Sequence, residues 1–264
     1  MSKSEPLIEL ENVTFSYPDF ADRIVFSDLT LGLPPGIVSL VGQNGTGKST
    51  LLLLAAGSVL PQEGRVRIMG IDTAELRDEH ERQRYVSYVF QNMEFETEEP
   101  AGALLDYVYE NGFHEDRSKA FLDELIDVFE LKRCLDKRTQ EISKGEMQRV
   151  ILAFSLLYGS KILVLDEPIF ALEDYQKTRA LDYLTGYARK EGVSLYFSLH
   201  ELELSKKYSD HTLLFYKDQR IILGPTEQVF TRDNIEEAFQ IPYHMLKIKQ
   251  ALYREMLTAA ERDV

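Results

Sequence analysis

The stretch Gly42-Gln43-Asn44-Gly45-Thr46-Gly47-Lys48-Ser49-Thr50 decides the fold of this chain. It fits the pattern G-x-x-x-x-G-K-[ST] of a phosphate-binding P-loop. Glycines in such a loop let the backbone turn successive N–H groups toward an anion. Lys48 would bring a mobile positive charge to the β- and γ-phosphates, and the Ser49 hydroxyl would bind Mg²⁺. The residues predicted to line this nucleotide phosphate site are Gly42, Asn44, Gly45, Thr46, Gly47, Lys48, Ser49 and Thr50.

The segments on both sides of the loop have the patterns that a P-loop requires. Upstream, the apolar and β-branched run Ile37-Val38-Ser39-Leu40-Val41 is typical of a buried strand. Downstream, the run from Thr50 to Ala56 predicts a helix whose positive N-terminal end points at the phosphates. A glycine-rich turn without a ligand is the alternative interpretation. The dinucleotide fingerprint G-x-G-x-x-G does not fit this glycine spacing.

Length and composition indicate an ordinary globular protein. A chain of 264 residues corresponds to one large domain or two small ones and is long enough for a substantial core. The net charge of -14 argues against nucleic acid as a partner, because nucleic acid requires a basic face. The single cysteine, Cys134, cannot form an internal disulfide, suits a reducing compartment and is expected to be a small buried side chain.

No targeting or membrane-spanning segment is predicted. The start of the chain, Met1 to Asn12, is polar and acidic and lacks the apolar core of a signal peptide. No apolar run approaches the roughly 18 residues that a membrane-spanning helix needs. If the protein serves a membrane, we therefore expect it to act through a partner.

Strand and helix patterns alternate along the chain. A helix-rich stretch of about forty residues follows an acidic, irregular stretch from Met93 to Gly112, and Tyr175 to Arg189 is typical of a crossover helix. The predicted strands are 7–17, 25–33, 37–41, 65–68, 85–90, 162–165 and 194–199, with a final hairpin at 212–215 and 221–223. Strands that alternate with helices around a P-loop imply an α/β fold with a largely parallel sheet covered on both faces. The helix-rich middle is predicted to be a lobe inserted into this fold.

Two carboxylates follow the apolar run Ile162-Leu163-Val164-Leu165. In P-loop proteins a carboxylate at the end of the neighbouring strand holds Mg²⁺, a role that suits Asp166. Glu167 would then accept a proton from an attacking water. The alternative interpretation is a strand that simply runs into a polar turn.

Further motifs occur in a fixed order along almost the whole chain. Tyr17 precedes the P-loop, Gln91 ends the strand pattern Val89-Phe90-Gln91, and His200 ends another strand. The stretch Ile142-Ser143-Lys144-Gly145-Glu146 stands before Met147-Gln148-Arg149-Val150, and Asp166-Glu167-Pro168 completes the set. With this order and spacing, the sequence resembles the ATP-binding subunits of ABC transporters.

The resemblance implies a role for each motif. Tyr17 matches the aromatic residue that stacks on adenine, Gln91 the Q-loop glutamine that contacts Mg²⁺ and water, and His200 the switch histidine that contacts the γ-phosphate. Residues 142–146 match the signature Leu-Ser-Gly-Gly-Gln. The implied catalytic residues are Lys48, Gln91, Glu167 and His200. The implied Mg²⁺ ligands are Ser49, Gln91 and Asp166, and the ATP contacts outside the P-loop are Tyr17, Ser143, Gly145 and Glu146.

The resemblance also implies a P-loop NTPase fold and a set of partners. The whole chain, 1–264, would be one ABC ATPase domain with an N-terminal antiparallel β part. Its core would be 1–91 and 161–225, its helical signature subdomain 92–160 and its mostly helical tail 226–264. Two copies would pair head to tail with ATP and Mg²⁺ between one P-loop and the other signature. This homodimer would drive an integral membrane permease from the cytoplasmic face, with a substrate-binding protein as an indirect partner.

Two departures from the family pattern matter. Lys144 replaces the first signature glycine and would obstruct the turn if that position requires a positive φ. Its ammonium would otherwise lie in solvent or near the partner's phosphate. Glu173 replaces the aspartate of the D-loop, Phe170-Ala171-Leu172-Glu173, and keeps its charge on a longer side chain.

The C-terminal part is similar to importers of iron-siderophores, cobalamin and metal chelates. The similarity rests on residues 200–210 and on Phe230 to Phe239 with Ile241-Pro242. A terminal helix is expected because Ile248, Ala251, Leu252, Met256 and Ala259 recur at helical spacing. An acidic stretch after Gln91 (Glu94, Glu96, Glu98 and Glu99) is predicted to receive a basic helix of the permease, or else to be a solvated loop.

Two other functions remain open at this point. One is a soluble ABC-type ATPase without a permease, although the long coiled-coil insert of the repair type and the tandem cassettes of the translation type are absent. The other is a nucleotide-binding regulatory module in which Lys144 has impaired hydrolysis. The transported substrate cannot be predicted, because selectivity would lie in the permease and any binding protein.

Overall fold

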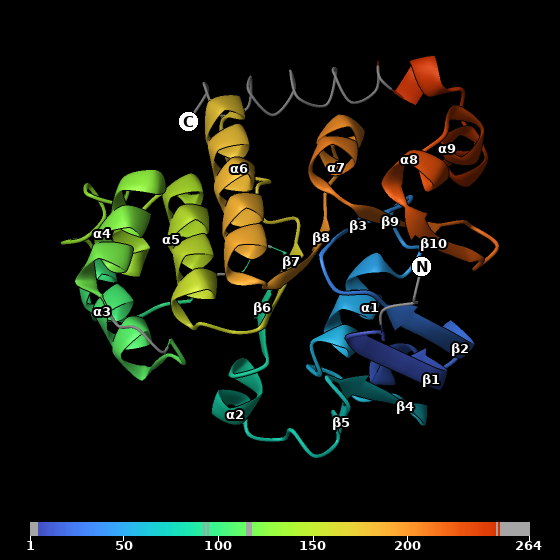
Figure 1. The fold of residues 1–264 in the computed structure, drawn as a ribbon, viewed down its shortest axis with the longest axis horizontal. Coiled ribbons are helices and arrows are strands. Elements are labelled where there is room, and N and C mark those ends of the chain that lie inside the picture. Colours follow the sequence, from blue (N-terminus) through green and yellow to red (C-terminus); the bar gives the residue numbers. More distant parts are fainter. Residues whose placement is uncertain (1–4, 92, 94, 115–117, 247, 249–264) are drawn as a thin grey trace.

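A computed structural model describes residues 5–91, 93, 95–114, 118–246 and 248. The P-loop strand β3 (Ile37–Val41) lies inside a six-stranded sheet, between β8 and β9. The strand order is β10-β9-β3-β8-β7-β6, in which β10 is antiparallel to β9 and the other strands run parallel. The other strands are β6 (Val86–Val89), β7 (Ile162–Asp166), β8 (Ser194–Ser198), β9 (His211–Phe215) and β10 (Ile221–Pro225). This topology brings the ends of β3, β6, β7 and β8 to one edge (Figure 1).

A four-stranded antiparallel sheet is formed by the first part of the chain. Its order is β2-β1-β4-β5, with β1 (Ile8–Ser16), β2 (Ile24–Leu33), β4 (Glu63–Ile68) and β5 (Ile71–Asp72). Alternate apolar side chains of β1, among them Ile8 and Leu10, are buried, as the alternating pattern predicted. They pack with helix α1 (Lys48–Ala55) in one core cluster that covers one face of the six-stranded sheet.

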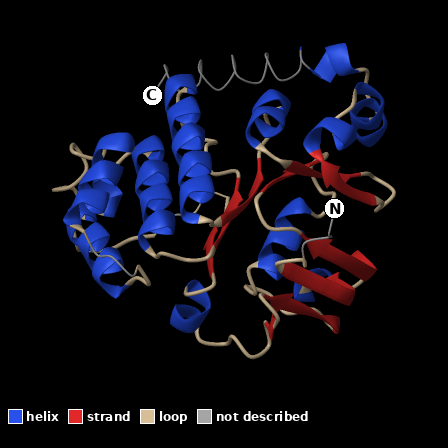
Figure 2. Ribbon diagram, viewed as in Figure 1, coloured by secondary structure: helices blue, strands red, loops and turns tan. Residues whose placement is uncertain are grey.

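The opposite face of the six-stranded sheet is covered by longer helices (Figure 2). Helix α6 (Asp174–Glu191) connects β7 to β8 and ends at Gly192 in the left-handed conformation that glycine favours. Helix α5 (Lys144–Leu157) lies beside it and buries an almost continuous apolar stretch. The buried side chains of both helices pack on Leu163, Leu165 and Phe197 of the sheet. Helices α1 and α5 therefore lie on opposite faces of the sheet.

The middle of the chain contains one helix that the sequence pattern did not indicate. The stretch from Met93 to Gly112 was expected to be irregular, but α3 (Ala101–Asn111) begins after Pro100 and buries Leu105 and Tyr109. Proline is well tolerated at the start of a helix, because the N–H that it lacks would have no partner within the helix. Helix α4 (Lys119–Val128) and α5 follow, as predicted, and Cys134 between them is fully buried. A short helix α2 (Glu79–Gln83) precedes β6.

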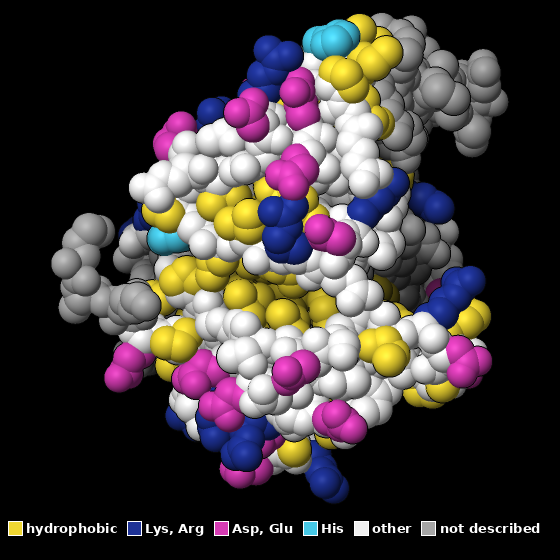
Figure 3. Space-filling model, turned by 90° about the vertical axis from the view of Figure 1, so that its right-hand side faces the viewer, with side chains coloured by type: hydrophobic (Ala, Val, Ile, Leu, Met, Phe, Trp, Pro, Cys, Tyr) yellow, Lys and Arg dark blue, Asp and Glu magenta, His cyan; other side chains and the backbone are white. Residues whose placement is uncertain are grey.

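The end of the described chain forms a third core cluster. Helices α7 (Leu202–Tyr208), α8 (Thr226–Val229) and α9 (Arg232–Phe239) pack around β9 and β10 with Val41, the last residue of β3. Figure 3 shows this side of the molecule, where apolar side chains gather in a hollow. Most of the predicted terminal helix lies outside the described residues. No helix in the described part of the chain has the length and apolar content needed to cross a bilayer.

The predicted fold class is confirmed by these elements. The sheet is mainly parallel, the antiparallel part is N-terminal, and helices α3, α4 and α5 lie together beside the sheet (Figure 1).

Candidate nucleotide site

The P-loop is shaped by glycines at positions where other residues would be strained or obstructed. Gly47 is the residue before α1 and has a φ of 98°. A Cβ at Gly47 would lie 2.8 Å from the Phe26 ring, and a Cβ at Gly42 would lie 2.8 Å from Cβ of Phe215. Gly45 also has a positive φ, of 78°, in the exposed part of the loop. The backbone therefore curves in front of the N-terminus of α1, where a phosphate is favoured.

Lys48, at the C-terminal end of the P-loop, bonds back to residues at the start of the loop. Its Nζ donates hydrogen bonds to the carbonyl oxygens of Gly42 and Gln43, at 2.8 and 2.9 Å. Burial lowers the pKa of this ammonium, while the negative charges of Glu167 and Asp166 raise it. The ammonium is thus partly desolvated, which strengthens its electrostatic interactions, and it lies near both carboxylates.

Asp166 and Glu167 lie at the end of β7 and are held by Ser198 on β8. The Asp166 side chain is 3% exposed, and one of its oxygens accepts a hydrogen bond from the Ser198 hydroxyl. The N–H of Glu167 donates to the same hydroxyl at 3.2 Å. Asp166 and Ser198 are opposite each other in the parallel pairing of β7 with β8, which explains this contact.

Ser198 was not predicted as a site residue. The available signal was a small polar residue at the end of a buried strand pattern, two positions before His200. The pairing register of two strands is a tertiary property, so the sequence alone did not place Ser198 beside Asp166.

The Glu167 carboxylate joins Gln91 and His200. One oxygen accepts a hydrogen bond of 2.7 Å from Nε2 of Gln91, and the other lies 2.7 Å from Nε2 of His200. These three residues follow β6, β7 and β8, which are neighbours in the sheet. Glu167 has a φ of 52°, an unusual backbone conformation for a residue with a side chain. Strained backbone of this kind often occurs at functional sites.

Tyr17 contacts the first turn of α1. Its hydroxyl lies 3.0 Å from Oγ1 of Thr50, within hydrogen-bond distance, and its ring packs edge-to-face on Phe15. Thr50 is 5% exposed, whereas Asn44, Gly45 and Ser49 are exposed on the loop. The predicted adenine-stacking residue is therefore connected with the helix that follows the P-loop.

The signature residues form the start of α5. The Ser143 N–H donates to the Glu146 carboxylate at 2.8 Å, and the Glu146 N–H donates to the Ser143 hydroxyl at 3.3 Å, a reciprocal cap. Lys144 is the first helical residue and is not among those with positive φ, so its backbone is not strained there. Gly145 faces the D-loop, because an added Cβ would lie 2.8 Å from the carbonyl oxygen of Ala171.

The predicted residues thus form two groups. Lys48, Gln91, Asp166, Glu167 and His200 are brought together around the P-loop. Ser143, Gly145 and Glu146 begin α5, on the other face of the sheet from α1.

The residues around the P-loop have the chemistry that a hydrated Mg²⁺ requires. Mg²⁺ takes oxygen ligands and is usually bound through one or two carboxylates together with phosphates. The Ser49 hydroxyl and the Asp166 carboxylate supply oxygens, and Gln91 keeps its amide oxygen because its nitrogen donates to Glu167. These oxygens would hold Mg²⁺ together with phosphate oxygens.

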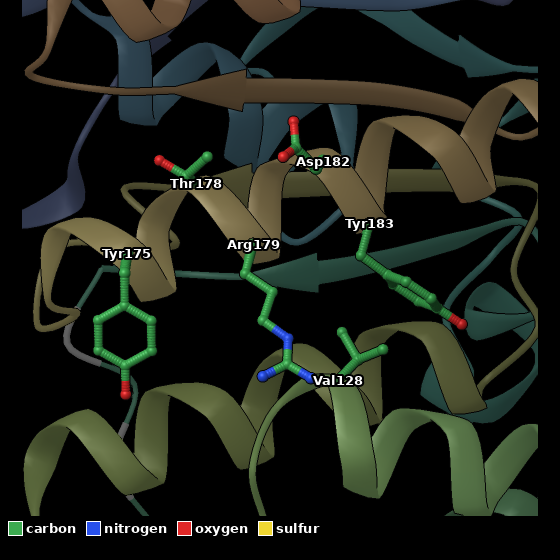
Figure 4. Close-up of a pocket in the computed structure, with 6 residues that line it drawn as sticks. All are labelled: Val128, Tyr175, Thr178, Arg179, Asp182 and Tyr183. Carbon is green, nitrogen blue, oxygen red and sulfur yellow. The ribbon is translucent and has the colours of Figure 1, made fainter.

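A separate pocket of about 400 Å³ lies along α6, away from the P-loop. It is lined by Val128, Tyr175, Thr178, Arg179, Asp182 and Tyr183 (Figure 4). Its charged groups already have partners within the chain: Arg179 binds Glu130 at 3.0 Å, and Asp182 accepts from the Tyr208 hydroxyl at 2.7 Å. The charged groups of this pocket therefore already take part in contacts within the chain.

Comparison with known proteins identifies similar chains. The family model described as ABC transporter matches residues 26–170. A protein of Pyrococcus furiosus, described as an ABC transporter ATP-binding protein, is 31% identical and aligns over 86% of this chain and 86% of its own. The manganese transport system ATP-binding protein MntA of Synechocystis is 30% identical over 88% of this chain and 89% of its own.

Some similar proteins are longer than this chain. It spans 41% of a relative from Bacillus cereus and 51% of one from Methanosarcina mazei. This chain therefore corresponds to only a part of each of those two proteins.

Two solved structures have the same fold. The dimeric, ADP- and Pi-bound ATP-binding cassette MJ0796 has a TM-score of 0.70 at 22% identity, covering 83% of this chain and 98% of its own. The cbiO1 protein from Clostridium perfringens, part of the complex cbiONQ, has a TM-score of 0.68 at 22% identity, covering 88% and 93%. At this identity the likeness establishes the fold alone.

Proposed function

Because this chain belongs to the ABC transporter family and is an ATPase of that family, we propose that its ATP hydrolysis drives transport through a separate membrane permease. The observation that carries the proposal is the Glu167 carboxylate, held between Gln91 and His200 beside the P-loop lysine. A carboxylate in this place can accept a proton from water that attacks a phosphate bound to the loop.

The phosphates of ATP would lie over the P-loop, against its N–H groups and the start of α1. Lys48 would exchange its two carbonyl partners for phosphate oxygens, which bind an ammonium more strongly because they are charged. Mg²⁺ would neutralise phosphate charge, held by Ser49 and Asp166 with Gln91 nearby. Ser198 would keep Asp166 in place by its hydrogen bond.

Glu167 and His200 would act side by side, Glu167 on the attacking water and His200 on the γ-phosphate. Glu167 orients and deprotonates the attacking water, and His200 would contact the γ-phosphate through its ring. Their 2.7 Å contact places both groups around one small volume. Gln91 would hold the remaining oxygen of Glu167, so that ligand binding at Gln91 also affects the base.

A head-to-tail homodimer would complete each site. The signature residues form the N-terminus of α5, whose positive end suits a phosphate, yet α5 and α1 lie on opposite faces of the sheet. One chain would therefore offer its Ser143 and Gly145 to the ATP of its partner, and the partner would do the same. The dimeric state of the MJ0796 cassette, which has the same fold, supports this arrangement.

The transported cargo would be an iron chelate, cobalamin or a metal, moved inward. The manganese transport system named for the Synechocystis relative supports a metal cargo, and the similarity of residues 200–210 and 230–242 to importers supports inward transport. The permease would hold the chain at the cytoplasmic face of the membrane, with a substrate-binding protein acting indirectly. The cbiONQ complex named for the cbiO1 structure supports a multi-subunit assembly.

Co-expression of this chain with its candidate permease tests the proposal. We expect the chain to co-purify with the permease in detergent and its ATPase rate to rise when the transported cargo is supplied. ATP hydrolysis without any permease association would favour a soluble ATPase instead. ATP binding without hydrolysis would favour a regulatory module.

A further inference from the structure

The side chain of Gln43 connects the P-loop to helix α9. Its Nε2 donates to the carbonyl oxygens of Ala238 and Phe239, at 3.2 and 2.5 Å. Position 43 is one of the unspecified positions of the P-loop pattern, so phosphate binding alone does not require glutamine there. The last carbonyls of a helix lack partners within the helix, and the amide of Gln43 supplies donors to two of them.

The backbone of the same residue holds the phosphate-binding groups. The carbonyl oxygen of Gln43 accepts from Nζ of Lys48 at 2.9 Å and from Oγ1 of Thr46 at 2.8 Å. The neighbouring Gly42 lies against Phe215 at the end of β9. A shift of Gln43 would therefore move the carbonyl that positions Thr46 and that holds Lys48 before the phosphates bind.

The C-terminal segment, which we define as Thr226–Leu246, is itself anchored in the core. Leu246 is 4% exposed and packs in the cluster that contains Val41, which immediately precedes the P-loop. Tyr243 donates its hydroxyl to Glu203 of α7 at 3.1 Å, and its N–H to Glu236 at 2.8 Å. The segment thus contacts the P-loop strand and the helix that follows His200.

We propose that Gln43 is a positioning residue through which the C-terminal segment sets the P-loop for the phosphates of a nucleoside triphosphate. The inference rests on the ATP binding of the proposed function. Coupling of this kind is reciprocal: if the segment favours the binding shape of the loop, nucleotide binding stabilises the segment on the loop.

Substitution of Gln43 tests the effect on binding. Gln43→Ala removes the amide, and Gln43→Met keeps its length without a donor. Loss of the net contribution of one hydrogen bond should raise the Kd for ATP by about threefold to tenfold. We expect this increase in both variants, with KM rising more than kcat falls, because no group that touches the reacting atoms is removed.

A matched control lies at the other end of α9. Asn234 donates its side-chain amide to the carbonyl oxygen of Val229 at 2.9 Å, a bond of the same type inside the segment. Asn234→Ala is expected to lower the melting temperature as Gln43→Ala does, but to leave the Kd for ATP within about twofold of the unsubstituted value. Equal losses of ATP affinity in Asn234→Ala and Gln43→Met would overturn the inference, because general loosening would then explain both.

A spectroscopic readout tests the coupling itself. The chain contains no tryptophan, so Phe239→Trp places a single tryptophan at the end of α9. We expect ATP to shift its fluorescence with the midpoint of ATP binding, and Gln43→Met to remove most of the shift at saturating ATP. A Phe239→Trp chain that binds ATP without any fluorescence change would overturn the inference. Absence of ATP binding in the unsubstituted chain would instead contradict the proposed function.

Discussion

The side-chain amide of Gln91 donates a 2.7 Å hydrogen bond to the carboxylate of Glu167, although the two residues are 76 positions apart in the sequence. The bond exists because β6 and β7 are neighbouring parallel strands with Val89 opposite Leu165, so the residues after each strand meet at one edge. His200, two residues after the end of β8, contacts the second oxygen of the carboxylate. The proton acceptor proposed for hydrolysis is therefore held by residues that follow the two adjacent strands.

Glu167→Gln is expected to preserve folding and ATP binding while lowering hydrolysis by about 100-fold or more, since an amide of the same shape cannot act as the base. Because ATP then persists between two chains, the variant should form an ATP-stabilised dimer. Sedimentation with and without ATP, together with phosphate release, measures both effects. Normal hydrolysis, or a monomer at saturating ATP, would contradict the role given to Glu167.

Lys48→Ala is expected to weaken ATP binding strongly and abolish turnover. The ammonium would make charge-assisted hydrogen bonds to phosphate, each contributing about 1.5–3 kcal/mol. Titration calorimetry measures the affinity. Lys161→Ala, which removes an exposed lysine just before β7, is the control and should bind ATP normally. Equal ATP affinities of the unsubstituted chain and Lys48→Ala would contradict the assignment of the P-loop as the ATP site.

Ser198→Ala tests the residue that the sequence did not reveal. The substitution leaves a buried Asp166 oxygen without its donor, which should lower the free energy of unfolding by about 1–3 kcal/mol. Hydrolysis should fall roughly tenfold, because a displacement of Asp166 disturbs the Mg²⁺ site. Ser194→Ala is the matched control on the same strand, where the hydroxyl accepts from Gly36 at the other end. It should lose stability but keep its kcat, and similar kcat losses in both variants would argue against a specific role of Ser198.

Glu130 lies between α4 and α5 and contacts residues of α6. Its carboxyl leads to a prediction about how the stability of the fold depends on pH. Burial alone would raise the pKa of its carboxyl, but hydrogen bonds from Tyr175 and Gln176 and the charges of Arg149 and Arg179 hold the pKa below its usual 4.5. A carboxyl whose pKa is lowered by folding stabilises the protein above the unfolded-state pKa, and this contribution disappears as the pH falls through the folded-state pKa.

Glu130→Gln should therefore cost about 1 kcal/mol of unfolding free energy at neutral pH, a small value because Glu130 is 36% exposed and solvent screens its charge. The difference from the unsubstituted chain should shrink below about pH 4. Urea denaturation at both pH values measures it. Asp127→Asn, which breaks one exposed pair with Lys132, should change stability less. A difference that persists in acid would show that packing, not charge, is the cause.

Local sequence patterns were sufficient for most of the fold, including the strand and the helix on either side of the P-loop. The strands other than the two-residue β5 were predicted because their apolar residues are continuous or alternate, and α6 because its apolar residues have helical spacing. Helix α3 was missed because the acidic residues before Pro100 obscured the apolar spacing of Ala101, Leu105 and Tyr109. The contacts of Ser198 with Asp166 and of Gln43 with α9 depend on strand register and tertiary packing, which local patterns do not encode.

The last prediction concerns the surface that would receive the permease. The acidic stretch after Gln91 is connected to the loop before α5: Thr97 N–H donates to Oγ1 of Thr139 at 3.0 Å, and exposed Glu98 pairs with Arg138 at 2.8 Å. Glu94 lies outside the described residues. Cytoplasmic loops of membrane proteins are enriched in Lys and Arg, so an acidic surface here would suit a basic helix.

Each exposed pair contributes only about 0–1 kcal/mol, so one substitution should have little effect. We therefore expect the joint replacement of Glu94, Glu96, Glu98 and Glu99 by glutamine to keep the ATPase rate of the free chain and to weaken its assembly with the permease. Because salt screens exposed charges, assembly of the unsubstituted chain should weaken with salt, and that of the variant should depend on salt less. Co-purification across a salt series measures this. The control replaces four exposed glutamates elsewhere: Glu63, Glu75, Glu191 and Glu227. Equal assembly of both variants at every salt concentration would leave the acidic stretch as ordinary solvated surface and exclude it as the docking site.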